Sequence, residues 1–123
     1  MTKKKRDVVW LKFDGRCAYC GHRITLPKDR QVDHIRPKRH FYSGDDVPDY
    51  HHDDFENLNP ACRFCNNWKS EMTVEEFREE IEAQIDRARR YSRNFRMAER
   101  YGMVGITKTK IQFHFERYGE TPK

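Results

Sequence analysis

Four cysteines in two equally spaced pairs constrain the fold of this chain more than any other feature. The pairs are Cys17-x-x-Cys20 and Cys62-x-x-Cys65. A Cys-x-x-Cys turn directs two thiolates toward one point, and two such turns complete the tetrahedral shell that zinc prefers. Because four thiolates leave no coordination position open, the pattern predicts a structural zinc ion that joins distant parts of the chain. Two unrelated pairs of buried thiols, or a redox pair, are the alternative interpretation.

The composition explains why such a chain needs a metal. Of 123 residues, 36% are hydrophobic and 37% are charged, so a single domain of this size buries little apolar surface. We expect one domain over residues 1–123. The net charge of +5 favours polyanionic partners such as nucleic acid. No apolar run reaches the length of a membrane span or a signal peptide, so we expect no membrane partner and a cytoplasmic, reducing location.

Local patterns in the first half predict short elements. Residues 6–13 favour a short helix, and residues 31–35 favour a strand that ends before Pro37. Residues 41–56 form a polar loop that carries six acids. A short helix is predicted over 63–69. The basic N-terminal tip, Lys3-Lys4-Lys5-Arg6, is expected to be a mobile arm.

The second half predicts helices followed by a strand. Thr73 and Glu76 have the spacing of a capping box, and apolar residues then recur every three or four positions, which predicts a helix over 74–90. A second helical segment over 94–101 would end at Gly102. Alternating apolar and polar residues over 111–116 predict a terminal strand.

Several polar motifs lie in a fixed order around the cysteine pairs. They are Asp33-His34-Ile-x-Pro37, Asn57-Leu58 and Cys62-x-x-Cys65-Asn66-x-x-Lys69. Together with Cys17-Ala-Tyr-Cys20-Gly21, these motifs resemble the HNH endonuclease family of ββα-metal nucleases over residues 6–70. The resemblance implies an α+β fold: a small zinc-stabilised ββα-metal finger over residues 6–70, with a helical C-terminal extension and a terminal strand over 73–118.

The resemblance also implies roles for individual residues. His34 would be the general base, since an ordinary histidine has a pKa near 6.5 and can accept a proton from water. Asp33 and Asn66 would ligate a catalytic Mg²⁺ or Mn²⁺, and Asn57 would hold the loop and orient the histidine. The family's commonest residue at position 66 is histidine, so this chain looks like a His-Asn-Asn variant, whose amide oxygen favours hard cations.

Each of these roles has a simpler alternative. Asp33 and His34 are neighbours on a predicted strand and point to opposite faces, so they share a site only if the strand bends or ends there. The pair could instead be a surface dipeptide. Asn57 could merely cap a turn, and Asn66 carries the same alternative.

Basic residues predict how DNA would be held. Arg89, Arg93, Arg96 and Arg100 would form one stripe on an uninterrupted helix, suited to phosphates. The full set of expected nucleic-acid contacts is Arg36, Lys38, Arg39, Lys69, Arg89, Arg93, Arg96 and Arg100.

The sequence therefore predicts an endonuclease that hydrolyses or nicks DNA with a histidine base and one divalent ion. Small members of such a family occur in bacteria and phages, so packaging or other DNA-processing proteins are expected partners, in a bacterial cell or in the host cytoplasm of a phage. A non-catalytic zinc-ribbon module that binds nucleic acid is the rival interpretation, and an RNA-cleaving enzyme is a third.

Overall fold

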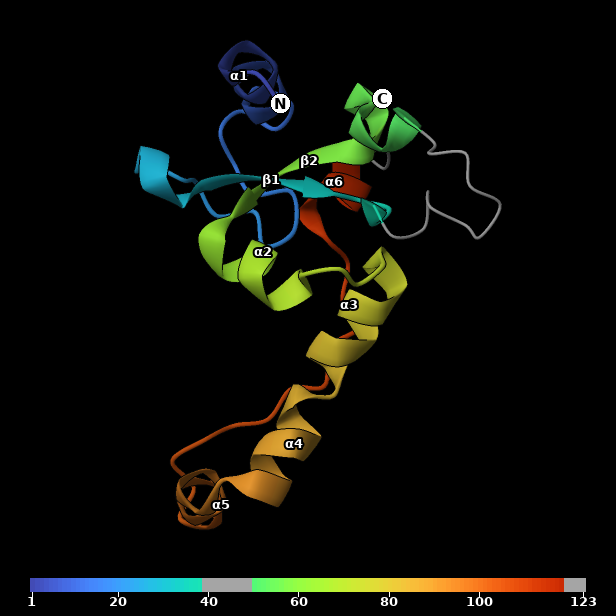
Figure 1. Ribbon diagram of the computed structural model, residues 1–123. Helices are drawn as coiled ribbons and strands as arrows, with labels where there is room; N and C mark the ends of the chain where they lie inside the picture. The colour runs from blue at the N-terminus through green and yellow to red at the C-terminus, as the bar shows by residue number, and fades with distance from the viewer. Residues whose placement is uncertain (39–49, 119–123) are drawn as a thin grey trace, which may run out of the picture. The chain divides into compact units, whose positions relative to one another are not determined.

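The computed structural model of the protein describes residues 1–38 and 50–118 (Figure 1). Its contacts divide the chain into two compact units. Unit 1 comprises Met1–Val74 together with the segment that begins at Gln112, and unit 2 comprises Glu75–Ile111. The expectation of a single domain stays a prediction. The α+β fold class is confirmed, since the described residues contain a two-stranded sheet and six α-helices.

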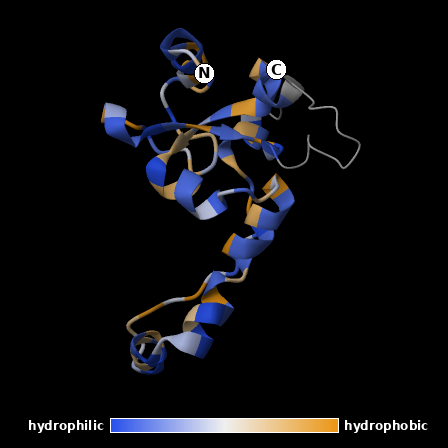
Figure 2. Cartoon of the chain, viewed as in Figure 1, coloured by the Kyte–Doolittle hydropathy of each residue, from blue (hydrophilic) through white to orange (hydrophobic). Residues whose placement is uncertain are grey.

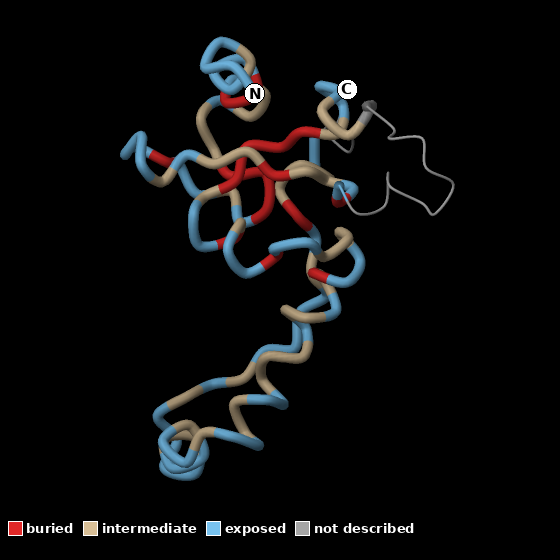
Figure 3. Tube along the Cα trace, viewed as in Figure 1, coloured by how far each residue is buried: buried red, intermediate tan, exposed pale blue. Residues whose placement is uncertain are grey.

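The sheet and one helix form the centre of unit 1. Strand β1 (Arg30–His34) pairs antiparallel with β2 (Leu58–Cys62), so that His34 lies opposite Leu58. Helix α2 (Arg63–Lys69) follows β2 directly and contacts both strands. The predicted strand near 31–35 and the predicted helix over 63–69 are therefore confirmed. Positions 58–61 of β2 are all buried, and Figure 3 shows this buried run.

The basic N-terminal tip belongs to a helix. Helix α1 (Lys3–Trp10) begins after Thr2, whose side chain accepts a hydrogen bond from the Lys5 amide at 3.2 Å. Val9 is fully buried and Trp10 is 6% exposed, so the end of the helix is anchored in unit 1. The expectation of a mobile arm is wrong, because side-chain capping and this apolar anchor stabilise the helix from its first turn. Among the described residues, short 3₁₀ turns lie at Pro27–Asp29, Tyr50–Asp53 and Phe55–Asn57.

The predicted terminal strand over 111–116 is wrong. Helix α6 (His114–Arg117) begins there, and the Phe113 amide donates to the Glu116 carboxylate at 2.9 Å. Phe113 is 2% exposed, and its ring meets that of Tyr19 edge-on at 5.2 Å between centroids. The alternating aromatic residues therefore mark one buried anchor at a helix start and not one face of a strand.

Unit 2 is helical. Helix α3 (Val74–Glu82) leads into it and is followed by α4 (Gln84–Tyr91) and α5 (Arg93–Arg100). The helix expected over 74–90 is thus interrupted at Ala83, which the unbroken apolar spacing could not reveal. Gly102 has a φ of +72°, which confirms that α5 ends at a left-handed glycine. Hydrophilic residues dominate α4 and α5, and neither helix contains a buried residue (Figures 2 and 3).

No helix within residues 1–38 and 50–118 has the length and apolar character needed to cross a membrane.

The four cysteines converge as the sequence predicts. Their sulfur atoms all lie within 4.8 Å of one another, and the Sγ atoms of Cys20 and Cys62 are 3.9 Å apart. Zinc bonded to four sulfurs at about 2.3 Å places those sulfurs about 3.8 Å apart. The set of donors and its dimensions therefore fit a structural zinc ion. The cluster joins the loop of residues 17–21 to the junction of β2 and α2, because Cys62 ends β2 and Cys65 lies in the first turn of α2.

The charge state of the cluster supports this interpretation. Hydrogen bonds from the thiols of Cys20 and Cys65 hold the pKa of Cys17 well below its usual value. The same contact with Cys17 raises the pKa of Cys20 to about 12, and the pKa of Cys65 is raised too. Without metal, Cys17 ionises first and its charge opposes ionisation of the others. A divalent cation removes that opposition, so metal binding should release protons.

We predict that Cys65→Ser loses zinc and much of the stability of unit 1. Structural zinc contributes about 10–16 kcal/mol of apparent binding free energy in zinc-finger peptides, which is comparable to the whole stability of a small domain. Metal content and thermal unfolding followed by circular dichroism measure the effect. Asn67→Ala, on the exposed side of the same helix, is the matched control. A Cys65→Ser protein that melts like the Asn67→Ala protein would show that the cluster does not stabilise the fold.

Candidate functional site

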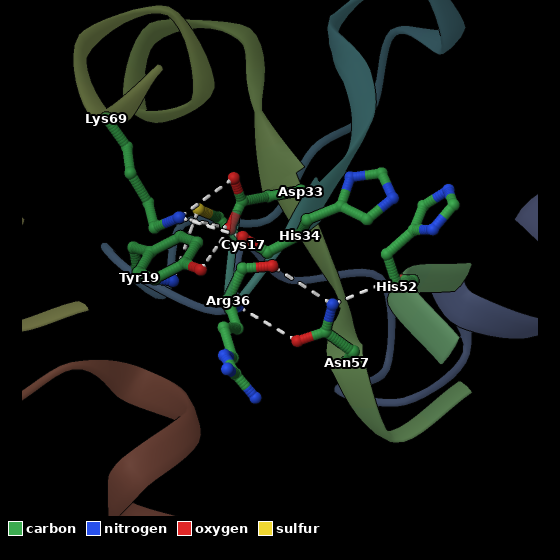
Figure 4. A network of polar contacts seen from close by, with 8 residues as sticks. All are labelled: Cys17, Tyr19, Asp33, His34, Arg36, His52, Asn57 and Lys69. Carbon is green, nitrogen blue, oxygen red and sulfur yellow. Dashed lines mark hydrogen bonds and ion pairs between the residues drawn. The ribbon is translucent and has the colours of Figure 1, made fainter. Parts of the chain in front are cut away.

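Asp33 and His34 lie on opposite sides of β1, at its last two positions. Asp33 is 3% exposed and faces the interior of unit 1. Its carboxylate accepts a hydrogen bond from the Tyr19 hydroxyl and lies 3.0 Å from the Lys69 ammonium (Figure 4). Burial raises the pKa of Asp33, and the charge of Lys69 opposes that shift. Burial, followed by the charge of Asp33, raises the pKa of Tyr19. Asp33, Tyr19 and Lys69 therefore form a buried network with one compensated charge pair.

Lys69 corrects one prediction. Its side chain is fully buried, so it cannot contact a phosphate of a bound nucleic acid. Besides Asp33, its ammonium group bonds the backbone carbonyl of His34 at 2.9 Å. Lys69 is the last residue of α2, and these bonds fasten the end of that helix to the end of β1. Its spacing after Asn66 thus reflects a structural role.

His34 points away from that network, toward the segment that precedes β2 (Figure 4). Its Nε2 atom lies 2.7 Å from Oδ1 of Asp53, and this hydrogen bond lowers the pKa of Asp53. An ionised carboxylate can only accept hydrogen bonds, so Nε2 must carry the proton in this contact. In the neutral ring the lone pair then lies on Nδ1. Sequence reasoning missed Asp53 because nothing distinguished it from the five other acids of the polar loop.

Asn57 bonds the backbone that follows His34 and the backbone that precedes Asp53. Its side-chain oxygen accepts from the Arg36 amide at 2.9 Å, and its nitrogen donates to the carbonyls of Arg36 at 3.1 Å and His52 at 2.8 Å. The backbone carbonyl of Asn57 also accepts from the Ile35 amide at 2.8 Å. Asn57 therefore ties the chain after His34 to the chain before Asp53. It does more than cap a turn.

A cavity of about 200 Å³ brings Asp33, His34 and Asn66 to one place. The Asn66 amide nitrogen donates to the Gln31 side chain at 2.8 Å, so its oxygen is the atom suited to a cation. Asp33, His34 and Asn66 all line this cavity, with the Asp33 carboxylate bonded to Tyr19 and Lys69 and the His34 ring bonded to Asp53. Within the described ranges, the four cysteines are the only group of three or more His, Cys, Asp or Glu residues placed to share a metal.

The expected nucleic-acid contacts are distributed unevenly. Arg36 and Lys38 are exposed just after β1, and Arg39 lies outside the described residues. In unit 2 the arginine stripe is divided between α4 and α5. Arg89 pairs with Glu99 at 2.9 Å, and Arg96 donates to the backbone carbonyl of Arg89 at 2.7 Å. Arg93 and Arg100 are exposed on α5.

We predict that Lys69→Met destabilises unit 1 by about 3–5 kcal/mol, since it leaves the buried Asp33 carboxylate uncompensated. Chemical denaturation measures the loss. Because burial already raises the pKa of Asp33, the native state holds that proton more tightly than the unfolded chain. Part of the loss should therefore be recovered as the pH falls through the raised pKa.

Two variants test this assignment. Adding Asp33→Asn to Lys69→Met should restore much of the stability, because the orphaned charge is gone. Lys108→Met, which breaks an exposed ion pair of 3.7 Å with Asp86, should change stability by less than about 0.5 kcal/mol. If Lys69→Met costs no more than Lys108→Met, the buried pair does not stabilise the fold.

Comparison with known proteins agrees with this geometry. No curated protein matches the sequence at a significant level. Residues 17–71, somewhat less than half of the chain, match the model of the HNH endonuclease family. The matched stretch contains both cysteine pairs, β1, β2 and α2, together with Asp33, His34, Asn57 and Asn66. Members of this family are typically nucleases that use divalent metal ions. The resemblance predicted from the sequence is confirmed for residues 17–71, which match the HNH endonuclease family model.

Proposed function

We propose that this protein is a metal-dependent endonuclease that hydrolyses DNA phosphodiester bonds with His34 as the general base. The observation that carries the proposal is the hydrogen bond of 2.7 Å from His34 Nε2 to Asp53, within an HNH domain. This contact fixes both the orientation of the ring and the nitrogen that carries the proton. A histidine whose other nitrogen is a free base at a cavity wall is suited to activating water.

The chemistry follows from this arrangement. Nδ1 of His34 takes a proton from water, the water oxygen bonds to phosphorus, and the bond from phosphorus to the 3′ oxygen breaks. The 3′ oxygen then takes a proton from solvent, which leaves 5′-phosphate and 3′-hydroxyl ends. Asp53 stabilises the imidazolium that forms, as a carboxylate does in other histidine-based sites. Asn57 ties the segment that follows His34 to the segment that precedes Asp53.

Asp33 and Asn66 would hold a catalytic Mg²⁺ or Mn²⁺ through oxygen atoms. Such an ion supplies charge to neutralise the leaving oxygen. Both residues line the cavity that also contains His34, and this shared cavity supports the assignment. Tyr19 and Lys69 hold the Asp33 carboxylate in place.

DNA is the proposed substrate, and packaging or another DNA-processing assembly is the proposed setting. A domain of this family implies nucleic acid as a partner. The exposed cations Arg36 and Lys38 follow His34 directly, so they support phosphate contact beside the reacting bond.

We predict that the wild-type protein nicks or linearises supercoiled plasmid with Mg²⁺ or Mn²⁺ and that His34→Ala lowers the rate by about 10²–10⁴-fold. The variant should keep its unfolding temperature, because the imidazole is part-buried and is not in the apolar core. His22→Ala, at an exposed histidine outside the site, is the matched control and should cut like the wild type.

Three outcomes would contradict the proposal in different ways. Cutting by His34→Ala at the wild-type rate would remove His34 as the base. A wild-type protein that binds DNA but never cuts it would favour the non-catalytic binding module. Cleavage of RNA in preference to DNA would change the substrate.

We predict that Asp53→Asn lowers kcat by about 10- to 100-fold, the range for a residue that orients another functional group. KM and the unfolding temperature should stay near the wild-type values, since Asp53 is 39% exposed and acts through His34. Adding the substitution to His34→Ala should cost nothing further, because the two residues act as one unit. Equal losses in both backgrounds would show that Asp53 acts independently of His34.

A further inference from the structure

Helix α1 lies beside the candidate catalytic residues and carries cations that the proposed function does not use. Lys5 donates to the backbone carbonyl of Asp53, and Lys12, just after the helix, donates to that of Phe55 at 2.7 Å. The helix is thus bonded to the segment that presents Asp53 to His34. The bonds of Lys5 and Lys12 therefore place the backbone of the helix beside that pair.

A cavity of about 640 Å³ lies between helix α1 and strand β1. Lys3 and Arg6 of α1 line one side, and Arg30 and Lys38 lie at the start and just beyond the end of β1. His34 and Asp53 also line this cavity. Lys3 and Arg6 are three residues apart and so share one face of the helix.

The charge of this cavity is predominantly positive. Four cationic side chains face two carboxylates, Asp7 and Asp53, and Asp53 already accepts a hydrogen bond from His34. Lys3 and Arg6 are exposed and form no ion pair with any residue that the structure describes. Unpaired cations of this kind suit the binding of a polyanion, because a cation already in an ion pair must first lose its partner.

We propose that this cavity, with Lys3 and Arg6 of helix α1, binds the DNA backbone beside the bond that His34 attacks. This inference rests on the proposed function and adds the path of the substrate through unit 1. The side chains involved are Lys and Arg on a helix face, so the contacts are to phosphates and carry no base specificity. Arg89 and Arg96 of unit 2, by comparison, are held by Glu99 and by backbone carbonyls.

Binding to the full-length His34→Ala protein tests the proposal without cleavage. The probe is a fluorescent duplex oligonucleotide of mixed sequence, titrated in Mg²⁺ buffer between about 50 and 200 mM salt. Lys3→Ala/Arg6→Ala should weaken binding and reduce the slope of log affinity against log salt by about two, one for each lost phosphate contact. The charge-preserving pair Lys3→Arg/Arg6→Lys should bind like its parent.

Lys4→Ala/Lys28→Ala is the matched control. It removes the same charge from unit 1, and Lys4 even belongs to the same helix, but neither lysine lines the cavity. Its salt slope should stay within a few tenths of the parent value. Equal effects of the two double variants would overturn the proposal, because binding would then depend on net charge alone.

Plasmid cleavage by the wild type, measured in parallel, separates this inference from the proposed function. If the wild type cuts DNA while Lys3→Ala/Arg6→Ala binds like its parent, the cavity is not the path of the substrate and the nuclease assignment stands. If the wild type never cuts but Lys3→Ala/Arg6→Ala loses binding, the cavity binds DNA and the proposed hydrolytic function is wrong.

Discussion

The convergence of four cysteine thiols is the constraint on which the rest of unit 1 depends. The cluster joins the loop of residues 17–21 to the point where β2 passes into α2. With only 36% hydrophobic residues, the chain has a small apolar core to hold a two-stranded sheet in register. A metal that fastens this junction fixes β2 and α2, and β1 then pairs along β2. That pairing places Asp33 and His34 at the end of β1.

The last two residues of β1 have different surroundings, which explains how one strand can carry both a buried ion pair and the candidate base. Adjacent strand residues face opposite ways. Asp33 faces inward, where Tyr19 and Lys69 hold its carboxylate, and His34 faces Asp53. Because the strand ends at His34, both residues can still reach the wall of one cavity. The buried ion pair thus fixes the end of β1, where His34 lies.

Sequence reasoning predicted the elements that depend on local or motif signals. The spacing of the cysteines predicted the four-cysteine cluster, and the order of the motifs predicted the match to the HNH family model. Helix α2 has the predicted bounds. It failed where long-range packing decides. The basic tip became helix α1 because Val9 and Trp10 are buried, and residues 113–117 became a helix start anchored by Phe113. Lys69 was assigned to DNA, and Asp53 was missed, because no local pattern shows which charged side chains meet in space.

The most direct test of the account is to locate two different metals and the substrate together. Crystals of His34→Ala grown with Mn²⁺ and duplex DNA would be measured at the zinc and manganese absorption edges. We predict zinc among the four sulfurs, manganese bound by Asp33 and Asn66, and a phosphodiester next to position 34. Manganese missing from that cavity, with the DNA bound elsewhere on the protein, would contradict it.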